Sequence, residues 1–160
     1  MILHASVPAD DPQRTATLLA RLFGGRALPF GPGEGSWTAV GPDPIGNVVT
    51  VLHRGSELHP RDGKEVETRI GSAVRHSAFH LLIETALAEK EVLELARETG
   101  CRAQRARHGM FDVIEFWIDD CLLIEVATPE LAEDYRRVAV SPELRERLAP
   151  IIAAGNRSHA

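Results

Sequence analysis

The 160 residues of the chain are enough for one compact domain or two small fused modules. The hydrophobic fraction of 44% is ordinary for a globular protein, but only 5% of the residues are aromatic, so Leu, Val, Ile and Ala must fill most of the core. The formal net charge is −5 and the sequence has no long basic run, which argues against nucleic acid and anionic membranes as partners.

No apolar run approaches the roughly 20 residues that span a bilayer. The N-terminus lacks the basic start, apolar core and small-residue cleavage site of a secretory signal. The two cysteines, Cys101 and Cys121, are too few to predict a disulfide framework at this length. The expected location is therefore the cytoplasm.

Residues 1–55 predict a strand, a helix and three further strands. Ile2–Val7 places a polar residue at every second position, which is the period of a strand. Asp11 before Pro12 is a good helix start, and Gly24 can end the helix in a left-handed conformation. The three strands that follow are predicted at Arg26–Phe30, Ser36–Val40 and Asn47–His53.

Residues 56–75 are polar and rich in turn residues, and we interpret them as a linker. The order of strand, helix and three strands then recurs in residues 76–128. Its elements are predicted at Phe79–Ile83, Ala88–Thr99, Cys101–Arg107, Phe111–Ile118 and Leu122–Ala127.

Residues 129–160 predict a C-terminal helical extension. Thr128-Pro129 and Ser141-Pro142 each look like an N-cap followed by a first helical residue. The second helix has an apolar stripe to bury, either against the body of the protein or against a second subunit. The stripe consists of Leu144, Leu148, Ile151 and Ile152.

The two βαβββ patterns indicate an internal duplication. An offset of 76 positions places His4 on His80 and Gly24 on Gly100, and it also aligns Leu19-Ala20-Arg21 with Leu95-Ala96-Arg97. The matching order of elements supports the duplication more strongly than these few identities do.

Strand periodicity assigns one apolar face to each strand and leaves an isolated polar group on the other. His4 and Ser6 share a face, and Thr50, His80, Glu115, Trp117 and Glu125 each lie opposite the apolar face of their strand. We therefore predict an α+β fold in which the two βαβββ modules form a cupped mixed sheet. Helices lie outside it, polar residues line the concave face, and C-terminal helices follow.

These features resemble the vicinal oxygen chelate superfamily, which includes glyoxalase I, extradiol dioxygenases, and fosfomycin- and bleomycin-resistance proteins. The resemblance rests on the paired modules, the histidine on the first strand of each, and the strand ending Leu-Ile-Glu-Val, and it covers about residues 1–130. It implies a divalent metal on the inner face of the sheet. By position the ligands are His4, His80 and Glu125, with Thr50 where many members carry a stronger ligand.

Two histidines and one carboxylate leave positions open for a chelating substrate. Such a set favours Fe(II) or Mn(II), with Zn or Ni as alternatives. The resemblance further implies that Glu115 acts as a base or supports the ligands. We expect Ser6, Thr50 and Trp117 to line the substrate pocket.

The leading hypothesis is a metal-dependent enzyme, dioxygenase-like or glyoxalase-like, that acts on a small oxygenated substrate. The alternative is a metal-free protein of the bleomycin-resistance type that binds or sequesters a small molecule. A structural role also remains open for the site residues, because Glu125 could form a salt bridge with an arginine. The expected partners are the small-molecule substrate and, through the C-terminal stripe, a second copy in a homodimer.

Overall fold

The computed structural model describes residues 4–31, 34–42, 48–60 and 67–157, with the backbone alone at residue 148 and at residues 151–157. The predicted start of the first strand at Ile2 and Leu3 and residue Asn47 lie outside the described residues. So do the side chains of Leu148, Ile151 and Ile152 in the predicted stripe. No described helix is both long and apolar enough to cross a membrane.

The first module contains the predicted βαβββ order. Its sheet has the strand order β1-β4-β3-β2, in which β1 and β4 are parallel and the other pairs are antiparallel. Its elements are β1 (His4–Ala9), α1 (Pro12–Phe23), β2 (Arg26–Leu28), β3 (Trp37–Val40) and β4 (Val48–His53).

The second module repeats this topology, with the strand order β7-β10-β9-β8 and a parallel β7–β10 pair. The predicted α+β fold class of two mixed βαβββ modules is therefore confirmed. The elements are β7 (His80–Glu84), α2 (Glu89–Thr99), β8 (Arg102–His108), β9 (Phe111–Ile118) and β10 (Leu122–Ala127).

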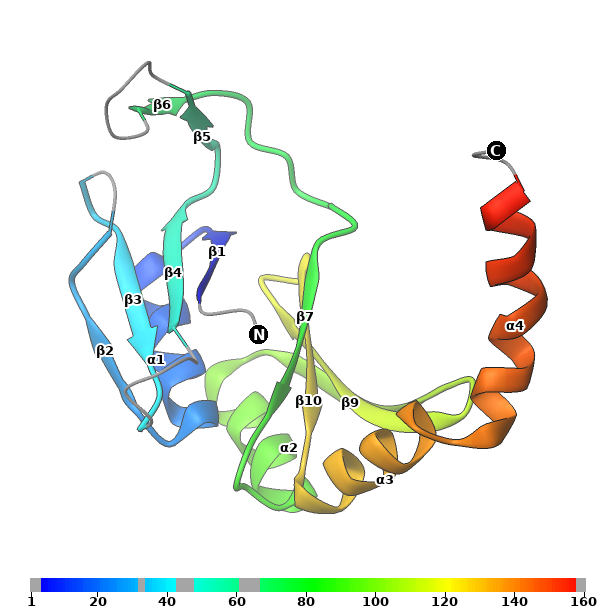
Figure 1. Cartoon of the computed structure of the whole chain (residues 1–160). Coiled ribbons are helices and arrows are strands. Elements are labelled where there is room, and N and C mark those ends of the chain that lie inside the picture. The colour runs from blue at the N-terminus through cyan, green and yellow to red at the C-terminus, as the bar shows by residue number, and fades with distance from the viewer. Residues whose placement is uncertain (1–3, 32–33, 43–47, 61–66, 158–160) are drawn as a thin grey trace.

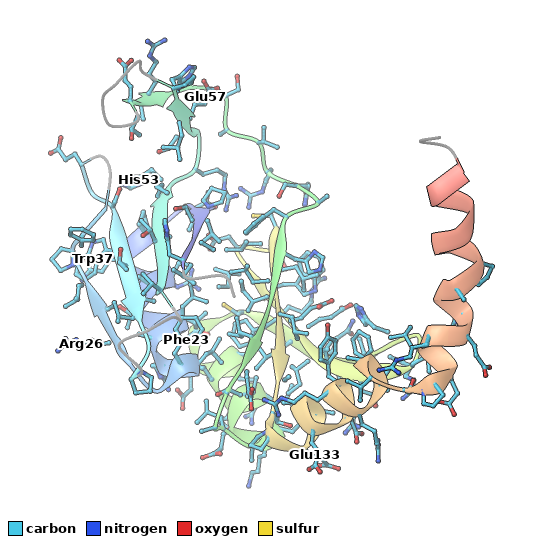
Figure 2. All side chains as sticks on the ribbon, viewed as in Figure 1. Phe23, Arg26, Trp37, His53, Glu57 and Glu133 are labelled. Carbon is cyan, nitrogen blue, oxygen red and sulfur yellow. The ribbon has the colours of Figure 1, made fainter. Side chains whose placement is uncertain are left out.

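Two further parts of the chain lie outside the modules, one between them and one after the second. The segment between them, for which the sequence predicted no strand, contains the two-stranded hairpin of β5 (Ser56–His59) and β6 (Glu67–Ile70). The predicted C-terminal helices are α3 (Pro129–Ala139) and α4 (Pro142–Arg157). Figure 2 shows the hairpin, marked by Glu57, and α3, marked by Glu133, at opposite ends of the molecule.

The helix ends show how closely the second module repeats the first. Gly24 and Gly100 both adopt left-handed backbone conformations, with φ of 68° and 66°. The Gly24 N–H faces the carbonyl oxygens of Ala20 and Arg21, and the Gly100 N–H faces those of Ala96 and Arg97. These positions differ by the same 76 residues as the two histidines. Glycine suits both sites because it adopts positive φ without steric cost.

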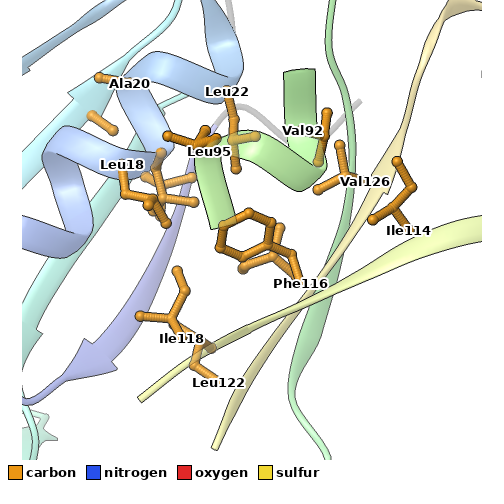
Figure 3. Packing of buried hydrophobic residues seen from close by; sticks show 14 of the residues in the cluster. Leu18, Ala20, Leu22, Val92, Leu95, Ile114, Phe116, Ile118, Leu122 and Val126 are labelled. Atoms are coloured by element: carbon orange, nitrogen blue, oxygen red, sulfur yellow. The ribbon is translucent and has the colours of Figure 1, made fainter. Parts of the chain in front are cut away.

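Helices α1 and α2 lie between the two sheets and contact each other (Figures 1 and 3). Thr85 donates a hydrogen bond of 2.6 Å to the carbonyl oxygen of Leu22, and Arg21 pairs with Glu98 at 2.8 Å. Because α1 and α2 each cover one face of their own sheet, the two faces opposite these helices point away from each other. Within one chain the two sheets are thus separate, rather than joined into one cup.

The apolar faces predicted from periodicity form one shared core. Phe116, Ile114 and Ile124 of the second sheet are fully buried in a cluster that also contains Val51 of the first sheet and Leu22 of α1 (Figure 3). Phe79, the first residue of the predicted strand Phe79–Ile83, does not join this core. It precedes β7 and remains 44% exposed, because β7 begins one residue later than predicted.

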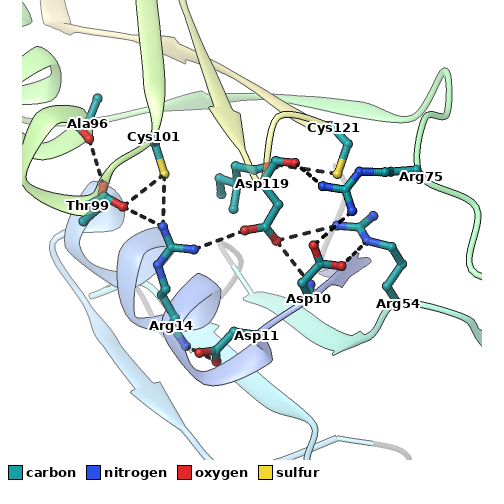
Figure 4. Close-up of polar contacts among 11 residues, drawn as sticks. Asp10, Asp11, Arg14, Arg54, Arg75, Ala96, Thr99, Cys101, Asp119 and Cys121 are labelled. Atoms are coloured by element: carbon teal, nitrogen blue, oxygen red, sulfur yellow. Dashed lines mark hydrogen bonds and ion pairs between the residues drawn. The ribbon is translucent and has the colours of Figure 1, made fainter.

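A charge cluster joins the ends of the two modules (Figure 4), and we define it as Asp10, Arg14, Arg54, Arg75 and Asp119. Asp119, in the β9–β10 turn, accepts a hydrogen bond from the Asp10 N–H at 3.2 Å and from Arg14 at 3.1 Å. The Arg54 side chain is only 7% exposed and reaches both aspartates. Its hydrogen bond to Asp10 holds the pKa of that carboxyl below the usual value.

Removing the charge of Asp119 tests how much this cluster stabilises the packing of the modules. Both Asp119 and Asp120 have φ of 54°, a conformation that Asn tolerates, so Asp119→Asn removes charge with little change in backbone strain. Arg14 and Arg54 would each lose a charged partner. We expect the free energy of unfolding in urea to fall by about 1.5–3 kcal/mol.

Asp120→Asn is the matched control. The Asp120 side chain is 75% exposed, and its contact with Arg102 is 3.7 Å long. Substitution there should change the free energy of unfolding by less than about 0.5 kcal/mol. Equal effects of the two substitutions would show that the cluster contributes no specific stability.

Candidate functional site

The face of the second sheet opposite α2 gathers the polar residues predicted there. Cross-strand register places Gln104 of β8 beside Glu115 of β9, and Glu115 beside Glu125 of β10. His80 of β7 lies on the same face, two residues before the partner of Glu125. Because side chains alternate along a strand, the register of four strands brings these groups to one surface.

Glu125 is a buried carboxylate whose partners are both histidines. Its side chain is 9% exposed. Oε1 lies 3.2 Å from Nδ1 of His108, and Oε2 lies 3.9 Å from Nε2 of His80. No arginine of the described chain forms an ion pair with Glu125, so the alternative of an arginine salt bridge receives no support. A buried carboxylate needs compensating partners, and here imidazole rings supply them.

The ring of His80 is oriented by the backbone of the residues just before β7. Nδ1 lies 3.2 Å from the carbonyl oxygen of Ala78, and because a carbonyl only accepts, Nδ1 is the donor. In the neutral ring this leaves the lone pair on Nε2, the atom that faces Glu125. A backbone carbonyl commonly orients metal-binding histidines in this way. His80 is half exposed, so solutes can reach it.

Glu115 is held as an anion by three donors. Gln104 donates to Oε2 at 3.0 Å, Nε2 of His108 lies 3.1 Å from Oε1, and the indole N–H of Trp117 is 3.5 Å from Oε2. The hydrogen bond from Gln104, followed by those from His108 and Trp117, lowers the pKa of Glu115 below its usual value. A carboxylate with a lowered pKa is a weaker proton acceptor at neutral pH, which does not favour Glu115 as a base. The base role expected from the sequence therefore stays a prediction.

The helix-free face of the first sheet carries the other predicted residues. His4 is exposed, and its Nε2 lies 3.3 Å from the hydroxyl of Ser6, which pairs in register with Thr50. Thr50 is buried, and its hydroxyl is 3.2 Å from that of Thr38.

Gly31 lies close above Thr50. A Cβ at Gly31 would come within 2.9 Å of Cγ2 of Thr50, so the Gly31 backbone covers this side chain. Burial, a hydroxyl partner and this cover leave little of Thr50 open to a ligand in one chain, and its predicted place in the substrate pocket stays a prediction.

The structure thus divides the predicted ligands between two surfaces. His80 and Glu125 lie together on the second sheet, whereas His4 lies on the outward face of the first. Within the described residues of one chain, no three His, Cys, Asp or Glu side chains form a group that could hold a metal ion.

His108 is the residue that sequence analysis missed, since it follows the predicted strand Cys101–Arg107. It bonds to both glutamates. The alternation of side chains along β8 could have identified it, because His108 lies on the same face of this strand as Gln104.

The role of Gln104 can be tested through the ionisation of Glu115. Gln104→Leu removes the donor that contributes most to the lowered pKa, so the pKa of Glu115 should rise toward its usual value. A pH titration of the side-chain carboxyl resonance of Glu115 by NMR measures this shift. Gln13→Leu, at an exposed position of α1, is the control. An unchanged pKa in Gln104→Leu would show that Gln104 does not hold Glu115 as an anion.

No family model and no curated protein sequence matches the chain. Solved structures do match. The fosfomycin resistance protein FosX from Listeria monocytogenes, in complex with Mn(II) and sulfate, has a TM-score of 0.53 at 16% identity, covering 86% of this chain and 96% of that one. FosX from Mesorhizobium loti has a TM-score of 0.51 at 17% identity, covering 83% and 95%.

A glyoxalase/bleomycin resistance protein from Albidiferax ferrireducens T118 also matches, with a TM-score of 0.51 at 12% identity, covering 79% of this chain and 96% of that one. These likenesses span both modules, and their low identity limits them to the fold. The chain therefore has the fold of the vicinal oxygen chelate superfamily, as its sequence predicted.

Proposed function

We propose that this protein is a metal-dependent enzyme of the vicinal oxygen chelate type, in which two copies of the chain complete each metal site. The observation that carries the proposal is the environment of Glu125. It is a buried carboxylate with histidines at both oxygens and no arginine partner in the described chain. A structural carboxylate would more often be neutralised by one of the chain's many arginines.

The separation of His80 and Glu125 fits a metal between them. Two ligand atoms that each lie about 2.0–2.2 Å from one metal can be at most about 4.4 Å apart. The 3.9 Å between Nε2 of His80 and Oε2 of Glu125 is within that limit and too long for a direct hydrogen bond. Imidazole nitrogen with carboxylate oxygen, and no thiolate, favours Mn(II) or Fe(II), with Zn or Ni as alternatives.

His4 would come from the second copy. It lies on the helix-free face of the first sheet, which points away from the face of His80 and Glu125 in the same chain. Among the described strands, β1 pairs only with β4 and β7 pairs only with β10, so each sheet has an edge free to add a strand. Pairing these edges between two chains would join one sheet of each into the predicted cup.

The assembled face would then perform the chemistry of a chelating site. A divalent metal bound there would act as a Lewis acid toward two vicinal oxygens of a small substrate. His80 would remain oriented by Ala78, Glu115 would present fixed negative charge beside the site, and Trp117 with Ser6 would line it. Dioxygenase-like and glyoxalase-like reactions both fit this arrangement. The Mn(II) in the FosX complex supports the choice of metal class.

A metal-free binding protein is the second candidate, and His108 favours it. In the described chain, His108 already contacts both Glu115 and Glu125. This contact gives the buried Glu125 and the partly buried Glu115 an imidazole partner without a metal ion. A protein of this kind would use the same concave face to sequester a small molecule.

Metal titration separates the two candidates. Metal-free wild-type protein should bind about one Mn(II) per chain in isothermal titration calorimetry, and His80→Ala and Glu125→Ala should each reduce affinity by at least about tenfold. Glu84→Ala is the control, because Glu84 is exposed at the end of β7 and pairs with Arg136. Absence of binding of Mn(II), Fe(II), Zn(II) or Ni(II) to folded protein would favour the metal-free candidate.

Mixing two inactive variants tests whether each site is shared between chains. His4→Ala and Glu125→Ala chains, unfolded together and refolded, should recover about a quarter of the wild-type Mn(II) capacity. Half of randomly paired dimers are mixed, and each mixed dimer holds one intact site of two. Each variant refolded alone is the control. If His4 belongs to the site of its own chain, the mixture will bind no more Mn(II) than the variants do separately.

A further inference from the structure

A cavity of about 310 Å³ lies where the C-terminal helices meet the second sheet. One side is the β8–β9 turn, and the others are the second half of α3 and the first two turns of α4. Figure 1 shows α4 leaving the end of α3 beside this turn. The volume is at the lower end of the range for small-molecule sites, which suits a ligand with a single ring or a short chain.

The cavity has an apolar wall built from the start of β9 with the turn before it, from α3 and from α4. The ring of Phe111 packs edge-on against that of Tyr135, with ring centroids 4.8 Å apart and an interplanar angle of 81°. This contact attaches α3 to β9 and gives one side of the cavity a rigid aromatic surface. The apolar residues of the wall are Met110, Phe111, Tyr135, Val138, Ala139 and Leu144.

The described lining of the cavity carries a basic side chain and no acidic one. No acidic residue is among the described residues that line the cavity, although the whole chain carries a net charge of −5. Its charged lining residue is Arg147, and no ion pair or hydrogen bond joins the Arg147 side chain to the described chain. Its neighbours Arg136 and Arg137 on α3 are both paired with carboxylates. An unpaired guanidinium beside an apolar wall complements a ligand with an apolar body and one anionic end.

We propose that this cavity binds a small amphipathic carboxylate, with its apolar body between Phe111 and Leu144 and its carboxylate on Arg147. Aromatic and aliphatic side chains would hold the body by excluding water, and the guanidinium would fix its orientation through charge-assisted hydrogen bonds.

His108 places the cavity next to the candidate metal site. Its ring lines the cavity, stacks against Phe111 at a centroid distance of 6.3 Å, and contacts both Glu115 and Glu125. The proposed ligand would therefore lie one side chain away from the two carboxylates. Binding in the cavity requires none of the predicted metal ligands, so the inference stands apart from the metal proposal.

Calorimetry with a matched pair of probes tests the inference on the full chain. We expect 4-phenylbutyrate to bind saturably and its uncharged analogue 4-phenylbutan-1-ol to bind about tenfold more weakly. Arg147→Gln should weaken phenylbutyrate binding about tenfold and leave the alcohol unaffected. Ala139→Trp should fill the cavity and abolish binding of both. Ala139 is exposed to solvent, so the larger side chain should not impair folding, which circular dichroism will check.

Two controls keep the outcome specific. Arg145→Gln removes a charge from the same helix at a position that does not line the cavity, and it should leave both affinities unchanged. His80→Ala should lose Mn(II) binding and still bind phenylbutyrate. A failure of the metal proposal can therefore be told apart from a failure of the cavity proposal. The inference is overturned if neither probe saturates, if Arg145→Gln and Arg147→Gln act equally, or if folded Ala139→Trp binds as well as wild type.

Discussion

Helix α1 packs against α2 in the space between the two sheets, and this packing sets the geometry of the rest of the chain. A helix can bury its apolar stripe only against another apolar surface, and here each helix covers its own sheet and also meets the other helix. The Thr85–Leu22 hydrogen bond and the charge cluster around Asp119 fix the relative position of the modules. As a consequence, the two sheet faces opposite α1 and α2 point in opposite directions.

This arrangement explains why one chain carries the parts of a site without assembling them. His80 and Glu125 are neighbours because β7 and β10 are paired, whereas His4 belongs to the other face. Glu125 in turn requires partners because a carboxylate loses its hydration when buried. The chain provides His108 on one oxygen and leaves the other oxygen facing His80. Such an incompletely compensated anion is the physical basis for proposing a cation there.

The C-terminal helices extend the second module beyond its repeated unit. The Phe111–Tyr135 contact anchors α3 to the sheet, and α4 begins beside the β8–β9 turn. These contacts create an apolar cavity that shares His108 with the polar face. In the part of the chain that the structure describes, no equivalent helices follow the first module. The C-terminal helices therefore break the symmetry of the duplication and give the two faces different surroundings.

The sequence by itself determined the local features of this protein. Period-two alternation assigned the apolar faces of the strands, and the Asp11 cap and the two glycines bounded the helices, because these signals act within a few residues. The duplication followed from their order, and with it the fold.

Only the tertiary structure decided which residues meet. It placed His108 between two glutamates, buried Thr50 beneath Gly31, formed the β5–β6 hairpin in the connecting segment, and turned His4 away from His80. These outcomes depend on cross-strand register and helix packing between residues far apart in the chain, and no local pattern specifies those contacts.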